Sequence, residues 1–185
     1  MRPPPTRTAA ESTDAVGHVT ALLVRFPEIA TIASHQAGGS IVISLVVARR
    51  LDRSARESLR DDVLDHVRTL LATTGDEPEV LALTCELDEG VTFVRIARDC
   101  RTLTREELAM LTALFSQRFG EALVKSPITD EPPDEDVAAQ DDLVECAIEA
   151  LRDPTQQKSL VGFREEKRVI VYFLKARKKA KAAAR

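Results

Sequence analysis

The alternation of apolar and polar residues predicts two β-hairpins, each followed by a helix, at a spacing of about fifty residues. The first hairpin turns through Gly38 and Gly39, and the second turns through Asp88, Glu89 and Gly90. Glycine accepts the positive φ angles that tight hairpin turns require. The predicted strands cover residues 29–34, 40–49, 80–87 and 91–98.

A capping box predicts where each following helix begins. Ser54 with Glu57 opens the first helix, and Thr104 with Glu107 opens the second. Gly75 predicts the end of the first helix. Both helices carry an apolar stripe at helical spacing, formed by Leu59, Val63, Val67, Leu70 and Leu71 in the first and by Leu108, Leu111, Leu114, Phe115, Phe119 and Leu123 in the second.

Further elements flank the two hairpin-helix units. Residues 14–26 predict a short amphipathic helix that Pro27 closes, and Val137 to Leu151 predict another that stops at Asp153-Pro154. Residues 160–163 and 168–174 predict a third hairpin with a charged turn. The order of these elements resembles that of small secretion chaperones, a likeness of element order that no residue motif accompanies.

These elements predict an α+β fold with an antiparallel sheet built from repeated hairpin-helix (ββα) units and helices packed mainly on one face. The strand at 40–49 is apolar on both sides, so we expect it to be central in the sheet and covered on both faces. An uncovered edge strand pairs readily with another chain, and the final hairpin is the candidate edge.

The chain divides into five predicted segments. Residues 1–13 form a disordered N-terminal extension, and residues 14–125 form an α+β domain with both repeats. Residues 126–136 form an acidic linker that contains Pro132 and Pro133, and residues 137–174 add a helix and a hairpin that we expect to complete the same domain. Residues 175–185 form a basic tail.

Composition narrows the classes of partner. The 185 residues are 44% hydrophobic but include no Trp, one Tyr and six Phe, which argues against a single-strand nucleic-acid binder that relies on stacking. No apolar run approaches the roughly 20 residues that a membrane helix needs. The first residues lack the apolar stretch of a secretory signal, and the three cysteines fit neither a disulfide framework nor a zinc site, so we expect a cytoplasmic protein.

The net charge of −4 is unevenly distributed along the chain. Six cations lie in the last eleven residues, which leaves 20 basic against 30 acidic residues in the remainder. The favoured interpretation is a tail that only solubilises the chain. The second interpretation is nucleic-acid or anion contact by the tail's cations, which are Lys175, Arg177, Lys178, Lys179, Lys181 and Arg185. Contact with an anionic membrane or an acidic protein is the third.

No pattern in the sequence predicts catalysis, a cofactor or a metal site. His66 lies in an apolar helical stripe, which favours a partly buried structural histidine, and a hairpin turn accounts for His35. Cys85 alternates with leucines and is interpreted as a small core residue, whereas Cys146 is predicted to be exposed. The acidic residues grouped on the helices are interpreted as solvated faces.

Two sets of arginines admit more than one interpretation. Arg118 lies on an apolar stripe, where extension of the side chain along the surface is the simpler interpretation and pairing with a buried carboxylate or an anionic ligand is the alternative. Arg49-Arg50 and Arg98 end equivalent strands of the two repeats. They indicate either a shared anion-binding edge or charged residues that protect apolar strands from aggregation.

The sequence therefore predicts a non-enzymatic protein-interaction, adaptor or chaperone-like module that assembles with itself or with a partner protein through a sheet edge or a helix face. The first alternative is an RNA- or ribosome-associated factor tethered by the basic tail. The second alternative is an enzyme without a motif visible in the sequence.

Overall fold

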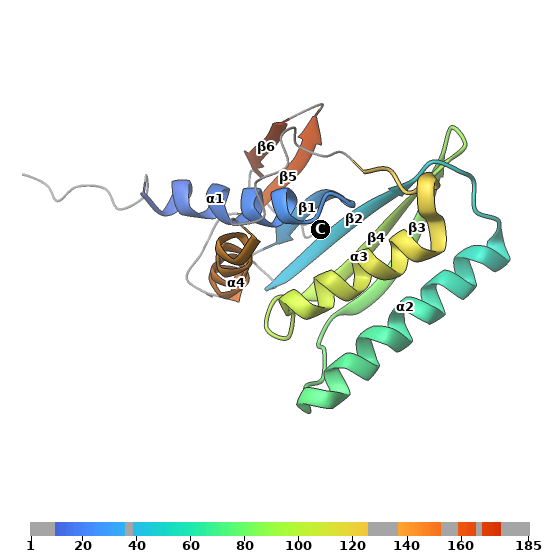
Figure 1. The fold of residues 1–185 in the computed structure, drawn as a ribbon, viewed down its shortest axis with the longest axis horizontal. Helices are drawn as coiled ribbons and strands as arrows, with labels where there is room; N and C mark the ends of the chain where they lie inside the picture. The colour runs from blue at the N-terminus through green and yellow to red at the C-terminus, as the bar shows by residue number, and fades with distance from the viewer. Residues whose placement is uncertain (1–9, 36–38, 126–136, 153–158, 166–167, 175–185) are drawn as a thin grey trace, which may run out of the picture.

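The computed structural model describes residues 10–35, 39–125, 137–152, 159–165 and 168–174. These residues form an α+β fold with four α-helices, one short 3-10 helix and a six-stranded sheet (Figure 1). The elements are α1 (Ala10–Arg25), β1 (Ile29–His35), β2 (Ser40–Val47), α2 (Arg53–Thr74), β3 (Leu81–Asp88), β4 (Val91–Asp99), α3 (Arg105–Phe119), η2 (Gly120–Ala122), α4 (Val137–Arg152), β5 (Leu160–Glu165) and β6 (Arg168–Phe173). Helix α1 begins before the predicted start near residue 14.

The sheet is antiparallel throughout, with the strand order β3-β4-β2-β1-β5-β6. Strand β2 lies inside the sheet, which confirms the predicted central position. Strand β5 pairs with β1, so the C-terminal hairpin belongs to the same sheet as the other two hairpins. The two edges of the sheet are β3 and β6.

The helices cover one face of this sheet (Figure 1). The strand registers align the side chains of that face in rows across the sheet, and one such row contains Leu83, Ile96, Ile43, Ile32 and Gly162. Helix α1 packs on β1 and β5 at one end of the face, and α2 packs on β3 at the other. Helix α4 packs mainly on α1.

The expectation that the strand at 40–49 is covered on both faces is wrong for the described residues. Val42 and Val46 point to the side opposite the helices and are only half-buried, and no described helix lies on that side. The apolar residues on both sides of β2 reflect its high β-propensity as well as burial, so the pattern does not by itself require two covering layers.

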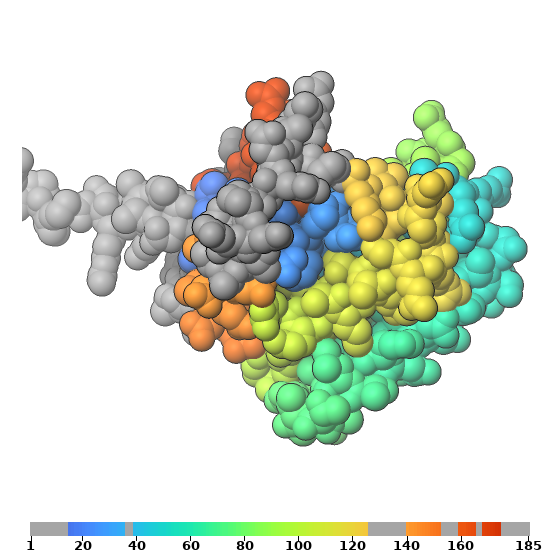
Figure 2. All heavy atoms as spheres, viewed as in Figure 1, coloured from blue at the N-terminus to red at the C-terminus, as the bar shows by residue number. Residues whose placement is uncertain are grey.

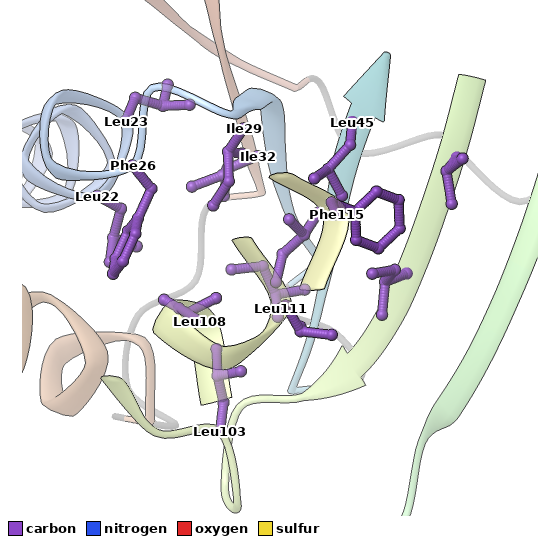
Figure 3. Packing of buried hydrophobic residues seen from close by; sticks show 14 of the residues in the cluster. Leu22, Leu23, Phe26, Ile29, Ile32, Leu45, Leu103, Leu108, Leu111 and Phe115 are labelled. Atoms are coloured by element: carbon purple, nitrogen blue, oxygen red, sulfur yellow. The ribbon is translucent and has the colours of Figure 1, made fainter. Parts of the chain in front are cut away.

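The core joins the helices to the sheet through aliphatic and aromatic side chains (Figure 3). Phe115 of α3 is fully buried and lies against Phe119, with ring centroids 5.7 Å apart. Leu22 and Leu23 of α1 are also fully buried. Phe26 follows α1, and its side chain points towards the core where the chain turns into β1.

Gly162 sets the distance between α1 and the sheet. A Cβ atom added at Gly162 would lie 2.4 Å from Val19 Cγ1 and 3.1 Å from Leu23 Cδ1. Real side-chain atoms do not approach this closely, so only glycine allows the helix to lie at its present depth over β5.

The predicted helix starts are confirmed in one of the two cases. The Thr104 side chain accepts a hydrogen bond from the Glu107 N–H at 3.2 Å and caps α3 as expected. The N-cap of α2 is Asp52, not Ser54, because the Asp52 carboxylate accepts the Ala55 N–H at 2.7 Å. The chain therefore begins α2 at Arg53, and Ser54 lies within its first turn.

The ends of the elements follow their turn residues. Gly75 ends α2 with a φ of 76°, as predicted, and Glu89 and Gly90 form the β3–β4 turn with φ angles of 43° and 86°. The predicted extension of the α3 stripe to Leu123 is wrong, because α3 stops at Phe119 and Leu123 forms a β-bridge with Val47.

A network of ion pairs joins α4 to the rest of the helical layer. Asp141 of α4 pairs with Arg25 at 2.8 Å and with Arg105 at 2.7 Å. Arg105 also pairs with Glu145 at 3.2 Å. These contacts link α1, α3 and α4, and the Arg152 guanidinium adds a hydrogen bond to the Leu103 carbonyl oxygen at 2.7 Å.

Candidate interaction surfaces

The described residues contain one fully buried guanidinium, that of Arg98. Its Nε and a second nitrogen donate to the two carboxylate oxygens of Glu107 at 2.6 Å and 2.9 Å. Asp99 accepts from Arg98 at 2.7 Å, and the Thr102 hydroxyl accepts at 3.0 Å. This cluster joins the end of β4 to the first turn of α3.

The buried cluster contradicts the interpretation of Arg98 as an open strand end equivalent to Arg49. Arg49 and Arg50 are exposed, whereas Arg98 is surrounded by carboxylates and cannot receive an external anion. Glu107 was predicted only as the capping-box partner of Thr104. The sequence did contain one signal for this cluster, because an arginine on an otherwise apolar strand face requires a buried partner.

Asp99 is held strongly in its ionised form. Burial alone would raise the pKa of Asp99, but hydrogen bonds from the Thr102 hydroxyl and from the Val80 and Thr102 N–H groups, with the charge of Arg98, outweigh burial and lower this pKa from 3.8 to about 2. Burial likewise opposes the charge of Arg98, yet Glu107 and Asp99 raise the pKa of Arg98. Asp99 and Arg98 are therefore both ionised across the physiological pH range.

This pKa predicts acid sensitivity. A carboxyl group with a pKa lowered by folding stabilises the native state above its unfolded pKa of 3.8, and this stabilisation is lost as the pH falls towards 2. The loss is expected to be about 2 kcal/mol, measured from urea unfolding by far-ultraviolet circular dichroism between pH 5 and pH 2.5. The Asp99→Asn variant should lose less stability over that range, and an equal loss in both proteins would contradict the assignment.

The Arg118 side chain of α3 forms contacts with side chains of α2. It forms an ion pair with Asp62 of α2 and donates to the Ser58 hydroxyl at 3.0 Å. Arg118 thus meets a carboxylate, but that of Asp62 is 48% exposed and not buried as the alternative expected. His66 is exposed on α2, with Nδ1 2.7 Å from the Asp62 carbonyl oxygen, so its predicted partial burial is wrong.

The thiols of Cys85 and Cys100 show no sign of activation. Cys100 is buried, and burial together with the Asp99 charge raises the pKa of its thiol to about 11. Burial also raises the pKa of Cys85, and the nearby Arg56 only partly offsets this effect. Cys146 is exposed, as predicted. A raised thiol pKa disfavours the thiolate that nucleophilic chemistry requires.

Within the described ranges, no group of three or more His, Cys, Asp or Glu side chains is placed to hold a metal ion. None of the helices in this part of the chain is long and apolar enough to span a membrane. The chain matches no protein-family model, no curated protein and no solved structure.

The edge strand β6 carries a concentration of exposed apolar side chains. Tyr172, Phe173 and Leu174 are 56%, 40% and 39% exposed, and the Tyr172 ring stacks on Phe163 at 5.8 Å between centroids. Exposed apolar residues at an edge strand indicate a surface for association. At the opposite edge of the sheet, β3 exposes the charged side chains of Glu86 and Asp88.

The ladder between β5 and β6 shows which backbone groups of β6 face outward. The Leu174 N–H donates to the Ser159 carbonyl at 2.7 Å, so this residue pair is of the hydrogen-bonded type. Hydrogen-bonded pairs alternate in an antiparallel ladder, which directs the N–H and C=O groups of Ile170 and Tyr172 towards β5. The corresponding groups of Val169 and Val171 point away from the sheet.

A cavity of about 450 Å³ lies between α1 and α4. Its wall includes the exposed apolar side chains Val24 and Leu143 and the side chain of His18. His18 Nδ1 is buried and has no hydrogen-bond partner among the described residues.

The predicted nucleic-acid or anion contacts lie outside the described residues. Lys175, Arg177, Lys178, Lys179, Lys181 and Arg185 belong to the segment 175–185, and the acidic linker 126–136 is likewise outside the description. Their roles stay predictions from the sequence.

Proposed function

We propose that this protein is a non-enzymatic protein-interaction module that assembles with a second copy through the edge strand β6. The observation that carries the proposal is the exposure of Tyr172 on the edge strand β6 and of Leu174 directly after it. Strands of this kind pair with another chain when no charge or proline protects them.

A two-fold axis beside Ile170 would place Val169 of each copy opposite Val171 of the other. The N–H and C=O groups of both residues face outward, so this register would satisfy them in pairs across the interface. Arg168 of each copy would then lie opposite Tyr172 of the other, where a guanidinium and an aromatic ring attract each other. The interface would be isologous, as in most dimers.

Substitution at Val171 tests the proposal. Val171→Pro removes one outward N–H and no bond to β5, so it is expected to weaken self-association at least about tenfold while preserving the fold. Val171→Thr keeps the N–H and the β-branched shape and serves as the matched control. Sedimentation equilibrium at raised salt measures the association, and circular dichroism checks that each variant is folded.

Tyr172→Lys provides a second variant that does not alter the backbone, since lysine on an edge strand opposes pairing. Its control is Leu143→Lys, which places the same charge at an exposed apolar site of α4 with 57% exposure. The proposal is contradicted if the wild-type chain stays monomeric up to about 100 µM, where association stronger than about 5 kcal/mol would be detected. Equal association of the Val171→Pro and wild-type chains would also contradict it.

Two finer expectations belong with this proposal. We propose that the two hairpin-helix segments are copies of one ββα unit, which is supported by a capped helix after each of the first two hairpins. Their surroundings differ, because Arg98 is buried and Arg49 is exposed. We also propose a cytoplasmic location, which the three free cysteines support.

A further inference from the structure

A second surface lies at the other edge of the sheet, between α2 and β3. A groove of about 280 Å³ separates the helix from the edge strand. Three arginines and one glutamate of α2 line one side, and two β3 side chains line the other: Arg53, Arg56, Glu57, Arg60, Leu83 and Cys85. Helix α2 forms the border of the helical face at this position (Figure 2).

The backbone of β3 is oriented to pair with a strand placed in this groove. The Asp99 N–H donates to the Val80 carbonyl at 3.2 Å, which identifies that pair as hydrogen-bonded. The alternation of the ladder then directs the N–H and C=O groups of Leu83 and Cys85 away from β4. The residues whose side chains line the groove are therefore also those with outward backbone groups.

The side of the groove formed by α2 is basic in a chain whose net charge is −4. Arg53 pairs with Glu57 at 2.8 Å, and Arg60 pairs with Asp61 at 3.0 Å. Arg56 donates to the Asp52 carbonyl oxygen at 3.3 Å and forms no ion pair with a described carboxylate. Exposed pairs of this kind contribute little and exchange readily, so all three guanidinium groups are accessible to an incoming carboxylate.

We propose that the groove binds an extended acidic segment of a partner protein, which adds to β3 as a further strand. Alternate side chains of such a segment face the same side as Leu83 and Cys85, where carboxylates reach the arginines of α2. The other side chains lie beside Ala82 and Thr84, which are exposed and uncharged. Backbone hydrogen bonds supply affinity, and the arginines select acidic sequences.

This inference goes beyond the proposed self-association because it concerns β3 and not β6. The failure of either proposal leaves the other intact. A polyanion such as nucleic acid would meet the arginines but would make no use of the Leu83 and Cys85 backbone groups. Variants that separate the backbone from the charge therefore distinguish the two kinds of partner.

The probe is a dye-labelled, amidated peptide of roughly eight residues in which glutamate alternates with valine, a length typical of strands. A matched peptide carries lysine in place of glutamate. Fluorescence anisotropy with the full chain is expected to show binding of the glutamate peptide only. Raised salt should weaken this binding, because the carboxylate–guanidinium contacts are partly exposed.

Two pairs of protein variants test the geometry. Cys85→Pro removes an outward N–H without removing a bond to β4, and is expected to raise the Kd of the glutamate peptide at least about tenfold. Cys85→Val keeps the N–H and should stay within about twofold of the wild type. Arg56→Glu should also raise the Kd at least about tenfold, whereas the same change at Arg68, outside the groove, should have little effect.

Strand addition is supported if the Cys85→Pro and Arg56→Glu variants lose binding of the glutamate peptide while the two control variants keep it. Absence of wild-type binding at low salt overturns the proposal. The proposal is also overturned if the Arg56→Glu variant no longer binds the peptide while a folded Cys85→Pro variant still binds it. The arginines would then form a simple anion site of the kind that nucleic acid could occupy. Amide exchange slowed at Leu83 and Cys85 by the peptide supports the proposal without any variant, and unchanged exchange there contradicts it.

Discussion

The Arg98→Met variant is expected to have a free energy of unfolding about 3–5 kcal/mol lower than the wild type. Arg98 is fully buried and is the shared partner of Asp99 and Glu107, whose side chains are 5% and 0% exposed. Methionine fills much of the volume but leaves two buried carboxylates without a counter-charge. Urea unfolding followed by circular dichroism measures the loss, since the chain has no tryptophan.

The pH dependence separates this cause from a simple packing defect. Without the guanidinium charge, the pKa of Asp99 should lie closer to its unfolded value of 3.8, so the variant should lose less stability than the wild type between pH 5 and pH 2.5. A packing defect alone would leave this loss in acid unchanged. Arg101→Met is the control, because Arg101 is 57% exposed and its loss should cost less than about 0.5 kcal/mol. A variant with unchanged stability, or with the same loss of stability in acid as the wild type, would contradict the role assigned to Arg98.

Gly162→Val is expected to lower the free energy of unfolding by about 3 kcal/mol, the second large effect. The new Cβ would collide with Val19 Cγ1, and Val19 is fully buried on a stiff helical rotamer. Helix α1 would have to rise from the sheet and lose its contacts with β5. Thermal and urea unfolding of the full chain measure the effect.

A double variant tests whether the collision is the cause. Val19→Ala removes the obstructing methyl groups. The free energy of unfolding lost by the double variant should therefore be smaller, by more than about 1 kcal/mol, than the sum of the losses in the two single variants. Gly17→Ala is the control, because an added Cβ there meets no atom within 4 Å and a helical alanine is favoured over glycine by about 0.5–1 kcal/mol. If the losses of Val19→Ala and Gly162→Val simply added in the double variant, the close contact between Gly162 and Val19 would not be what sets the position of α1.

Local patterns predicted the secondary structure well where the chemistry is local. The Glu89-Gly90 turn and the Thr104 cap depend on neighbours within three residues, and both are present. The cap of α2 was misplaced because Asp52 and Ser54 are both good N-cap residues, and only the direction of the chain leaving β2 decides between them.

The long-range features could not be predicted from periodicity. The pairing of β5 with β1 joins residues about 130 positions apart, and no property of either strand alone specifies its partner. The Arg98 cluster likewise depends on the position of α3 over β4, and the groove beside β3 depends on the position of α2. In the last two cases a charged residue acquires its role from the packing of helices onto the sheet.

The choice of sheet edge in the proposed self-association would decide how many copies can assemble. If β6 paired with β3 of the next copy, the contact would repeat without closing and produce an open filament. A two-fold contact between β6 strands instead stops at two copies and leaves the α2–β3 grooves at opposite ends of one continuous sheet, roughly 50 Å apart. Such a dimer is bivalent, and it would retain a partner with two acidic segments far longer than either groove could alone.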